Sequence, residues 1–220
     1  MNTKRNRGLF ITLEGPEGSG KSTQIPALVT WLRAQGWKVV STREPGGTRI
    51  GEEIRALLHN PAHTEMAPLT EILLYSASRA QHVAEVIRPA LTAGQIVICD
   101  RYFDSTYAYQ GYGRGLELPV LREITRFATG RLIPDLTCYL DIEPERGLRR
   151  RQEGGEEMNR LDRETLAFHR RVYAGYLALI KEEPERWVTV NADQSIEQVQ
   201  LELRALVEQR LSTRHAANNS

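Results

Sequence analysis

A glycine-rich segment near the amino terminus has the residue types and spacing of a phosphate-binding loop. GPEGSGKS occupies residues 15–22 and follows the apolar run LFITL at 9–13. Glycines allow the tight turn in which successive backbone N–H groups point at phosphate oxygens, and the helix that follows adds the positive end of its dipole. A lysine at position 21 reaches the β- and γ-phosphates, and the hydroxyl of Ser22 binds Mg²⁺.

This loop predicts an ATP site that extends one residue beyond the motif. We expect the following residues to contact ATP: Gly15, Pro16, Glu17, Gly18, Ser19, Gly20, Lys21, Ser22 and Thr23. Lys21 is also expected to be catalytic, because it meets charge that develops on the transferred group. A chance glycine-rich turn is the alternative, and the apolar strand before the loop and the amphipathic helix after it argue against that alternative.

The elements that position the loop alternate between strands and helices. The strands are expected at 8–13, 37–42, 95–100, 136–141 and 187–191, and further helices at 68–92, 164–183 and 195–211. The strand segments are almost continuously apolar, as in parallel strands covered on both faces. We therefore expect one α/β domain spanning 1–220, built on a five-stranded parallel sheet with helices on both faces, and a disordered polar tail at about 212–220.

Polar residues follow the strands, where the sites of parallel sheets form. Asp100 closes the strand at 95–100, and an acid in this place holds Mg²⁺ through water. Arg101 beside it can bind a phosphate with two N–H groups. A structural ion pair between Asp100 and Arg101 is the alternative, but a phosphate loop in the same sheet favours a functional role.

A second binding site is indicated by aromatic, hydroxyl and amide residues in DRYFDSTYAYQGYG, which begins at Asp100. Tyr109 and Gln110 can pack against a small planar molecule and hydrogen-bond to it. Tyr75 and Arg79 lie one helical turn apart on one face, which suits a nucleotide base with its polar edge. For Tyr75 alone, core packing is the simpler expectation.

The segment RRRQEGGEEMNRLDR at 149–163 has the pattern of a mobile arginine-rich lid, because Gly154 and Gly155 interrupt a helical pattern. A closing lid supplies positive charge and excludes water during phosphoryl transfer. Consecutive helical residues point about 100° apart, so one or two of the arginines can face the phosphates. We expect the catalytic lid residue among Arg149, Arg151 and Arg163. The alternative is a solvated charged helix, since acids are mixed in.

Composition limits the partners of the chain. Its 220 residues carry 29 basic and 28 acidic side chains, so a net charge of +1 gives no global field for nucleic acid or membrane. The segment MNTKRNRG lacks the apolar core of a signal peptide. Cys99 and Cys138 lie inside expected strands, where small core residues in a reducing compartment are the natural expectation. We expect a cytoplasmic protein without nucleic-acid or membrane partners.

Three segments in this order, GPEGSGKS, REPGGT and DRYFDSTYAYQG, resemble the bacterial type of thymidylate kinase. The similarity runs from about Leu9 to the last expected helix. It implies the P-loop nucleoside-monophosphate kinase fold and transfer of the γ-phosphate of ATP to dTMP, which gives dTDP for dTTP synthesis. It also implies Mg²⁺ as cofactor and a homodimer. Another nucleoside-monophosphate or deoxynucleoside kinase on this fold, or a P-loop module without catalysis, are the competing interpretations.

The resemblance also implies roles around the base of dTMP. Arg79 resembles the arginine beside the thymine, and Thr106 and Gln110 resemble polar readers of its edge. Tyr75 falls where the family usually stacks a phenylalanine on the base. This tyrosine is a departure, because its hydroxyl needs a partner or water.

Four further residues resemble family positions around the sugar and phosphate. Arg101 resembles the arginine on the dTMP phosphate, and Glu17 resembles an acid near the 3′-hydroxyl. Tyr109 resembles the ring under the deoxyribose, which disfavours a 2′-hydroxyl, and Pro45 shapes the pocket. Some members carry an arginine inside the phosphate loop where this chain has Gly18, and the arginines in the lid correspond to the bacterial arrangement.

Overall fold

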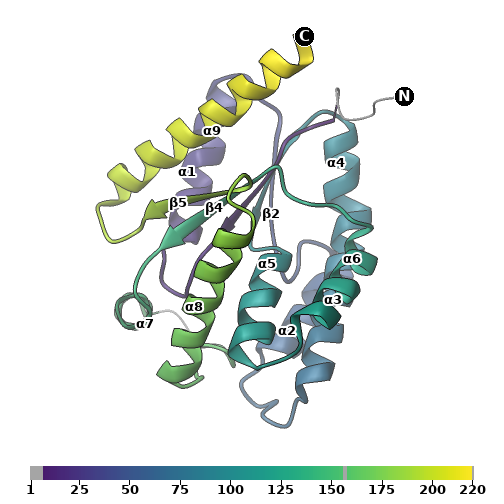
Figure 1. The fold of residues 1–220 in the computed structure, drawn as a ribbon, viewed down its shortest axis with the longest axis vertical. Helices are drawn as coiled ribbons and strands as arrows, with labels where there is room; N and C mark the ends of the chain where they lie inside the picture. Colours follow the sequence, from purple (N-terminus) through teal and green to yellow (C-terminus); the bar gives the residue numbers. More distant parts are fainter. Residues whose placement is uncertain (1–6, 156–157, 220) are drawn as a thin grey trace.

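A parallel sheet forms the centre of the computed structural model, which describes residues 7–155 and 158–219. Its strands are β1 (Phe10–Glu14), β2 (Val39–Arg43), β3 (Ile96–Asp100), β4 (Leu136–Asp141) and β5 (Trp187–Asn191), in the order β2-β3-β1-β4-β5. All four pairings are parallel, and β1 in the middle pairs with β3 and β4 (Figure 1). The predicted five-stranded parallel sheet is confirmed: β4 and β5 have the predicted bounds, and the bounds of the other three strands differ by at most two residues.

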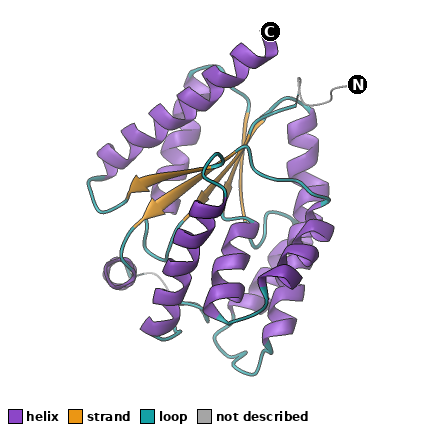
Figure 2. Cartoon of the chain, in the orientation of Figure 1, coloured by secondary structure: helices purple, strands orange, loops and turns teal. Residues whose placement is uncertain are grey.

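Helices cover both faces of the sheet (Figure 2). On one face lie α1 (Lys21–Ala34) and α9 (Ile196–Asn219). The other helices are α2 (Arg49–His59), α3 (Pro68–His82), α4 (Arg88–Thr92), α5 (Phe103–Thr106), α6 (Leu118–Thr129), α7 (Pro144–Glu153) and α8 (Leu166–Glu182). Within β1, Ile11 and Leu13 enter the core under α1 and α9, whereas Phe10 enters the core under α3 and α8. This alternation explains the continuously apolar strands.

Two π-helical segments interrupt the helices that face the site. Val83–Ile87 joins α3 to α4, so the predicted helix at 68–92 is one continuous rod with a local widening. Tyr107–Gly113 continues α5 and contains Tyr109 and Gln110. Such π segments are frequent at functional sites, where they change the direction of side chains along a helix.

The carboxyl-terminal helix is longer than the sequence pattern indicates. The polar residues from 212 onward, for which a disordered tail is predicted, continue α9 as far as Asn219. Residues 212–219 contain two alanines and neither glycine nor proline, so no residue there stops the helix. Across the described ranges, none of the helices combines the length and the apolar character that crossing a bilayer requires.

Candidate active site

A cavity of about 800 Å³ opens at the carboxyl ends of the strands. Its walls come from the phosphate loop, the ends of β2 and β3, α3, the π segment at 107–113, the lid, and the turn between β5 and α9. This is the edge at which parallel sheets bind ligands. The volume lies in the upper part of the range for ligand pockets.

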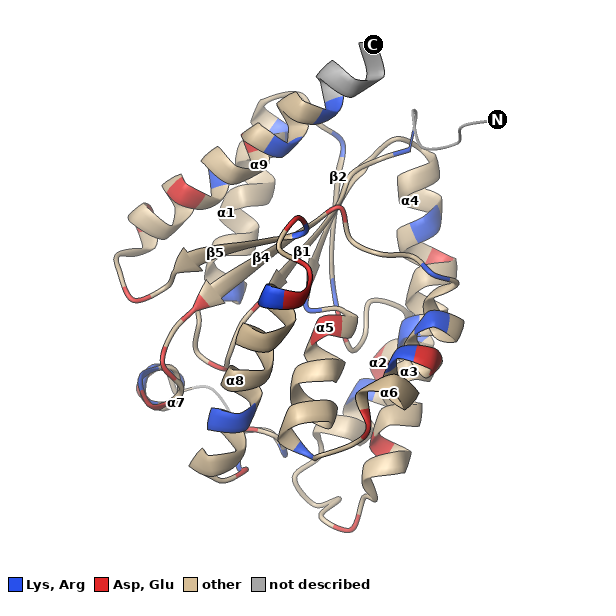
Figure 3. Ribbon diagram, viewed as in Figure 1, with Lys and Arg blue, Asp and Glu red and all other residues tan. Residues whose placement is uncertain are grey.

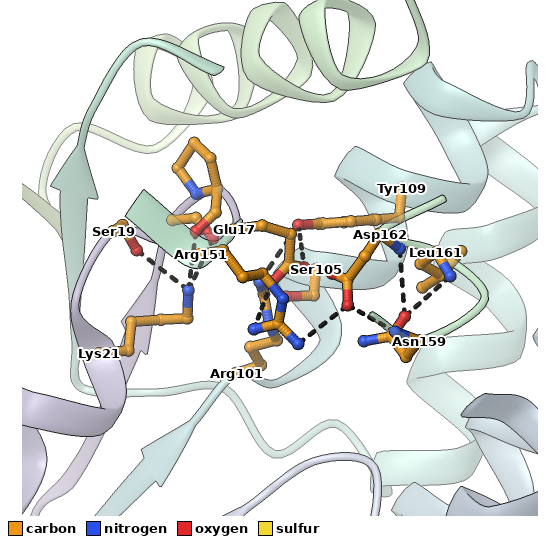
Figure 4. A network of polar contacts seen from close by, with 12 residues as sticks. Glu17, Ser19, Lys21, Arg101, Ser105, Tyr109, Arg151, Asn159, Leu161 and Asp162 are labelled. Atoms are coloured by element: carbon orange, nitrogen blue, oxygen red, sulfur yellow. Dashed lines mark hydrogen bonds and ion pairs between the residues drawn. The ribbon is translucent and has the colours of Figure 1, made fainter. Parts of the chain in front are cut away.

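The phosphate loop has the backbone shape expected from its glycines. Gly15, Gly18 and Gly20 have φ angles of 148°, 69° and 88°, which side chains disfavour. Lys21 Nζ donates to the carbonyl oxygens of Gly15 and Pro16 and to Ser19 Oγ, each at 3.0 Å (Figure 4). Burial, together with the nearby charge of Arg101, lowers the pKa of Lys21 to about 8, so the amine is still charged at neutral pH.

The loop also contacts the first helix of the lid backbone to backbone. A Cβ atom on Gly18 would lie 1.9 Å from the carbonyl oxygen of Gly147 in α7, and a Cβ on Gly147 would lie 2.2 Å from the carbonyl oxygen of Glu17. This contact fixes which face of α7 points toward the loop.

Arg101 adopts a left-handed backbone conformation, with φ of 65°, which is unfavourable for a residue with a side chain. Its guanidinium donates through Nη1 to Ser105 Oγ and Tyr176 OH, both at 3.1 Å. Through Nη2 it donates to Glu17 Oε1 at 2.8 Å and to Tyr109 OH at 3.1 Å (Figure 4). A strained backbone and four partners hold the group at the cavity wall, where it can receive an oxyanion.

Two glutamates beside the loop differ in their pKa. Burial raises the pKa of Glu17, but the charges of Arg101, Lys21 and Arg151 outweigh burial and lower it to about 2. Glu14 at the end of β1 is fully buried, and burial with the charge of Asp104 raises its pKa to about 7 despite Arg101. Glu14 was not predicted from the sequence, although an acid that ends an apolar strand is itself a signal.

Glu14 connects the strand to the residues that hold Arg101. Its carboxylate accepts from the backbone N–H of Tyr102 at 2.8 Å, from Ser105 Oγ at 2.6 Å and from Tyr176 OH at 2.8 Å. Ser105 and Tyr176 are also the partners of Arg101 Nη1. A change in the protonation of Glu14 therefore acts on the support of Arg101.

The residues predicted to bind Mg²⁺ both line the cavity. Asp100 Oδ1 is buried and has no hydrogen-bond partner among the described residues, so it is an acceptor that lacks a donor or a cation. Ser22, which follows Lys21, lines the same cavity. In the part of the chain that the structure describes, no three His, Cys, Asp or Glu side chains gather as a metal cluster. One carboxylate and one hydroxyl fit Mg²⁺, which takes its remaining ligands from water and substrate phosphates.

The residues predicted at the base also line the cavity, Tyr75 and Pro45 among them. Arg79 Nε donates to Glu44 Oε2 at 2.7 Å and its Nη2 to Thr106 Oγ1 at 3.0 Å. Its Nη1 is buried without a partner within 7–155 and 158–219. Gln110 Nε2 donates to Glu71 Oε1 at 2.8 Å. The carboxylates that orient Arg79 and Gln110 were missed in the sequence, where nothing marks them as buried.

The lid places one of its three predicted arginines in the cavity. Arg151 lies four residues after Gly147, on the face of α7 that contacts the loop. Its Nη2 lies 2.9 Å from Asp162 Oδ2, and its Nη1 lies 3.8 Å from Glu17 Oε2 (Figure 4). Arg149 and Arg163 are exposed and, among the described residues, do not line the cavity. Residues 156–157 of the predicted lid lie outside the described residues.

The charged-helix alternative for the lid applies to part of α7. Both basic and acidic residues lie on this helix, as the blue and red segments of α7 in Figure 3 show. Arg146 pairs with Asp193 and is exposed, as expected for a solvated face. Arg150 also pairs with Asp193, at 3.1 Å, and in addition donates to the carbonyl oxygen of Ala192 at 2.8 Å. The cavity wall beside it was not foreseen from the sequence and consists of Gln24, Arg150, Ala192, Gln194, Ser195, Ile196 and Val199.

Comparison with known proteins identifies the family. The family model for thymidylate kinase matches residues 13–203 of the chain. The chain belongs to the thymidylate kinase family. A thymidylate kinase of Roseiflexus castenholzii is 55% identical over 217 residues, covering 93% of this chain and 95% of that protein. One of Bacillus cytotoxicus is 52% identical over 206 residues, covering 93% of this chain and 99% of that protein.

A solved structure of the same family has the same fold. The crystal structure of thymidylate kinase from Ehrlichia chaffeensis matches with a TM-score of 0.74 at 32% identity, over 91% of this chain and 99% of that chain. The predicted thymidylate kinase resemblance and the predicted P-loop kinase fold are both confirmed by these matches.

Proposed function

We propose that the chain transfers the γ-phosphate of ATP to the 5′-phosphate of dTMP, which gives dTDP and ADP. The observation that supports dTMP as the phosphoryl acceptor is a pair of groups in the cavity that can read its base. Arg79 has a buried donor to which no described residue is bonded, and Gln110 has its amide oxygen left after Nε2 is bonded to Glu71. Thymine presents an acceptor, O4, next to the N3–H donor, whereas cytosine presents a donor and an acceptor in the reverse order.

The phosphate end of the cavity supplies the transfer chemistry. Phosphoryl transfer requires positioning and charge neutralisation, and little else, from the protein. Lys21 and the loop N–H groups hold the donor phosphates, while Arg101 exchanges its bond with Glu17 for the phosphate of dTMP. Arg151 reaches between the two sites from the lid. When bound at Ser22 and Asp100, Mg²⁺ supplies further charge neutralisation at the donor phosphates.

Tyr109 provides the selection for a deoxyribose. Its hydroxyl donates to Glu17 Oε1 at 2.9 Å and accepts from Arg101, so the ring cannot turn aside without breaking both bonds. A 2′-hydroxyl would have to fit against this fixed ring. We therefore expect dTMP to be preferred over UMP by a large factor.

A coupled assay of ADP release tests this function. ATP is supplied with dTMP, dUMP, UMP, dCMP or AMP as acceptor, and specificity constants are compared. The proposal predicts the highest value for dTMP and a much lower value for dCMP. A higher constant for any other acceptor would support another nucleoside-monophosphate kinase instead, and equal constants for dTMP and UMP would reject the role of Tyr109.

We also propose a homodimer formed through α2, α3 and α6. Large apolar side chains are exposed on all three helices: Leu57 on α2, Leu69 and Leu73 on α3, and Phe127 on α6, the last 92% exposed. Because α3 packs against both α2 and α6, these side chains belong to one group of adjoining helices (Figure 1). An exposed apolar surface of this kind marks a protein interface. We expect the wild-type protein to sediment as a dimer and Leu73→Glu to sediment as a monomer. A wild-type monomer at micromolar concentration would overturn the proposal.

A cytoplasmic setting is part of the same proposal. Cys99 and Cys138 are both free and buried, which suits a reducing compartment. Fractionation of cells that produce the chain, followed by immunoblotting, tests this setting.

A further inference from the structure

Glu71 on α3 accepts hydrogen bonds from two other parts of the chain, the segment around 110–114 and the lid, although its side chain is only 1% exposed. Its Oε1 accepts from Gln110 Nε2 at 2.8 Å and from Arg114 Nε at 3.3 Å. Its Oε2 accepts from Arg114 Nη2 at 3.2 Å and from Arg160 of the lid. A buried carboxylate with this many donors is held in one position.

This carboxylate determines how the amide of Gln110 is oriented. An ionised carboxylate only accepts hydrogen bonds, so Gln110 must turn its Nε2 toward Glu71. Oε1 of Gln110 then points away from Glu71. No group among the described residues donates to Oε1 of Gln110, and Gln110 lines the cavity. The oxygen is thus left as the acceptor for a ligand.

We propose that Glu71 is a positioning residue that fixes the Gln110 amide with its oxygen toward the nucleobase, and that it thereby sets the preference for a pyrimidine with an N3–H donor over cytosine. This inference rests on the proposed function, because it requires the base to bind beside Gln110. Cytosine offers an unprotonated N3, which would face the amide oxygen with two acceptors opposed. Without Glu71 the amide can turn over and present Nε2, which donates a hydrogen bond to N3 of cytosine and cannot accept one from the N3–H of thymine.

The two arginines keep the carboxylate in the form that this role requires. Burial raises the pKa of Glu71, but hydrogen bonds from Arg114 and Gln110 and the charges of Arg114 and Arg160 outweigh burial and lower it. Glu71 therefore stays ionised, and acceptor only, across the neutral range. A purely structural role, in which Glu71 does no more than hold Arg114 and Arg160, is the competing explanation.

The Glu71→Gln variant separates the two explanations. Its new amide both donates and accepts, so it no longer dictates the orientation of Gln110. We expect the KM for dTMP to rise about tenfold with kcat within about threefold, since one hydrogen bond to the base is worth about a factor of ten. The ratio of dTMP to dCMP specificity constants should fall at least tenfold. If the turnover of the variant is impaired, the ratio of the Kd values for dTMP and dCMP, measured by titration, gives the same comparison.

Two further variants serve as controls. Glu164→Gln removes the other carboxylate that pairs with Arg114 but leaves Gln110 untouched, and it should keep the wild-type ratio. Glu71→Asp keeps the charge opposite both arginines and shortens the side chain by one methylene. It should lower the ratio as Glu71→Gln does, and it replaces that variant if the neutral side chain prevents folding.

A double-mutant cycle provides the decisive comparison. In a Gln110→Ala background, Glu71→Gln should change the dTMP to dCMP ratio by less than twofold, because the residue through which it acts is absent. An equal change in both backgrounds, or a wild-type ratio in Glu71→Gln, would overturn the inference. Failure of the proposed function is distinct: wild-type protein would then show no preference for dTMP at all.

Discussion

The Glu14→Gln variant isolates the electrostatic cost of burying an acid directly before the phosphate loop. Burial and the charge of Asp104 raise the pKa of Glu14 from 4.5 to about 7. A folded-state pKa above the unfolded value means that the folded chain binds the proton more tightly. The stability that this proton provides is complete below pH 4.5 and is lost as the pH rises through 7.

The size of the effect follows from the shift. Each pKa unit corresponds to 1.36 kcal/mol, so a rise from 4.5 to about 7 amounts to about 3 kcal/mol of lost stability between pH 4 and pH 8. For a domain of this size, such a loss lowers Tm by roughly 10 °C. Glutamine cannot ionise, so Glu14→Gln should lack this component. Because Asp104 is close and also has a raised pKa, the transition belongs to the pair.

Urea unfolding of wild type and Glu14→Gln at several pH values between 4 and 8, at constant ionic strength, measures the difference. Wild type should lose stability relative to the variant as the pH rises. Glu17→Gln serves as the contrast, because the pKa of Glu17 is held at about 2 and its contribution is present above pH 4.5 and lost toward low pH. A difference between wild type and Glu14→Gln that does not change with pH would refute the reasoning.

Three other predictions concern turnover and stability. Lys21→Ala should reduce kcat about 10²–10³-fold with an unchanged circular dichroism spectrum, and near-native turnover would reject its role. Arg151→Ala should reduce kcat about 10³-fold with little change in the KM for dTMP. Arg149 is exposed, so Arg149→Ala should keep a kcat near that of wild type. Equal effects of the two substitutions in steady-state kinetics would contradict the assignment of Arg151 as the lid arginine. Asp104→Asn should cost about 3–5 kcal/mol in urea unfolding, because it removes the buried charge partner of Arg186 and leaves this arginine with the more exposed carboxylate of Glu183, and Asp104→Leu combined with Arg186→Met should recover most of this stability.

The sheet could be predicted because its strands are covered on both faces. Residues such as Phe10 and Ile11 enter different cores, so the sequence shows a continuous apolar run that ends where the site begins. The phosphate loop and Arg101 were predictable for the same reason, since they directly follow strands. A local pattern was sufficient for these features.

The lid arginine and the buried acids depended on contacts between distant segments. Nothing in three consecutive arginines distinguishes Arg151 from Arg149 until the contact of Gly147 with the loop fixes the rotation of α7. Glu71 occupies a helix and has the residue type of a solvated surface, but Arg114 and Arg160 arrive from far along the chain to bury it. Pairwise charge compensation of this kind leaves no periodic signal.

The contact between Gly18 and Gly147 restricts how this enzyme could change in evolution. Any side chain at position 18 meets the carbonyl oxygen of Gly147 at 1.9 Å and a φ of 69° that disfavours it. A substitution at Gly18 therefore also displaces α7, and with it Arg151 of the lid. The loop and the lid can therefore change only together, because a side chain added to the loop moves the helix that carries Arg151.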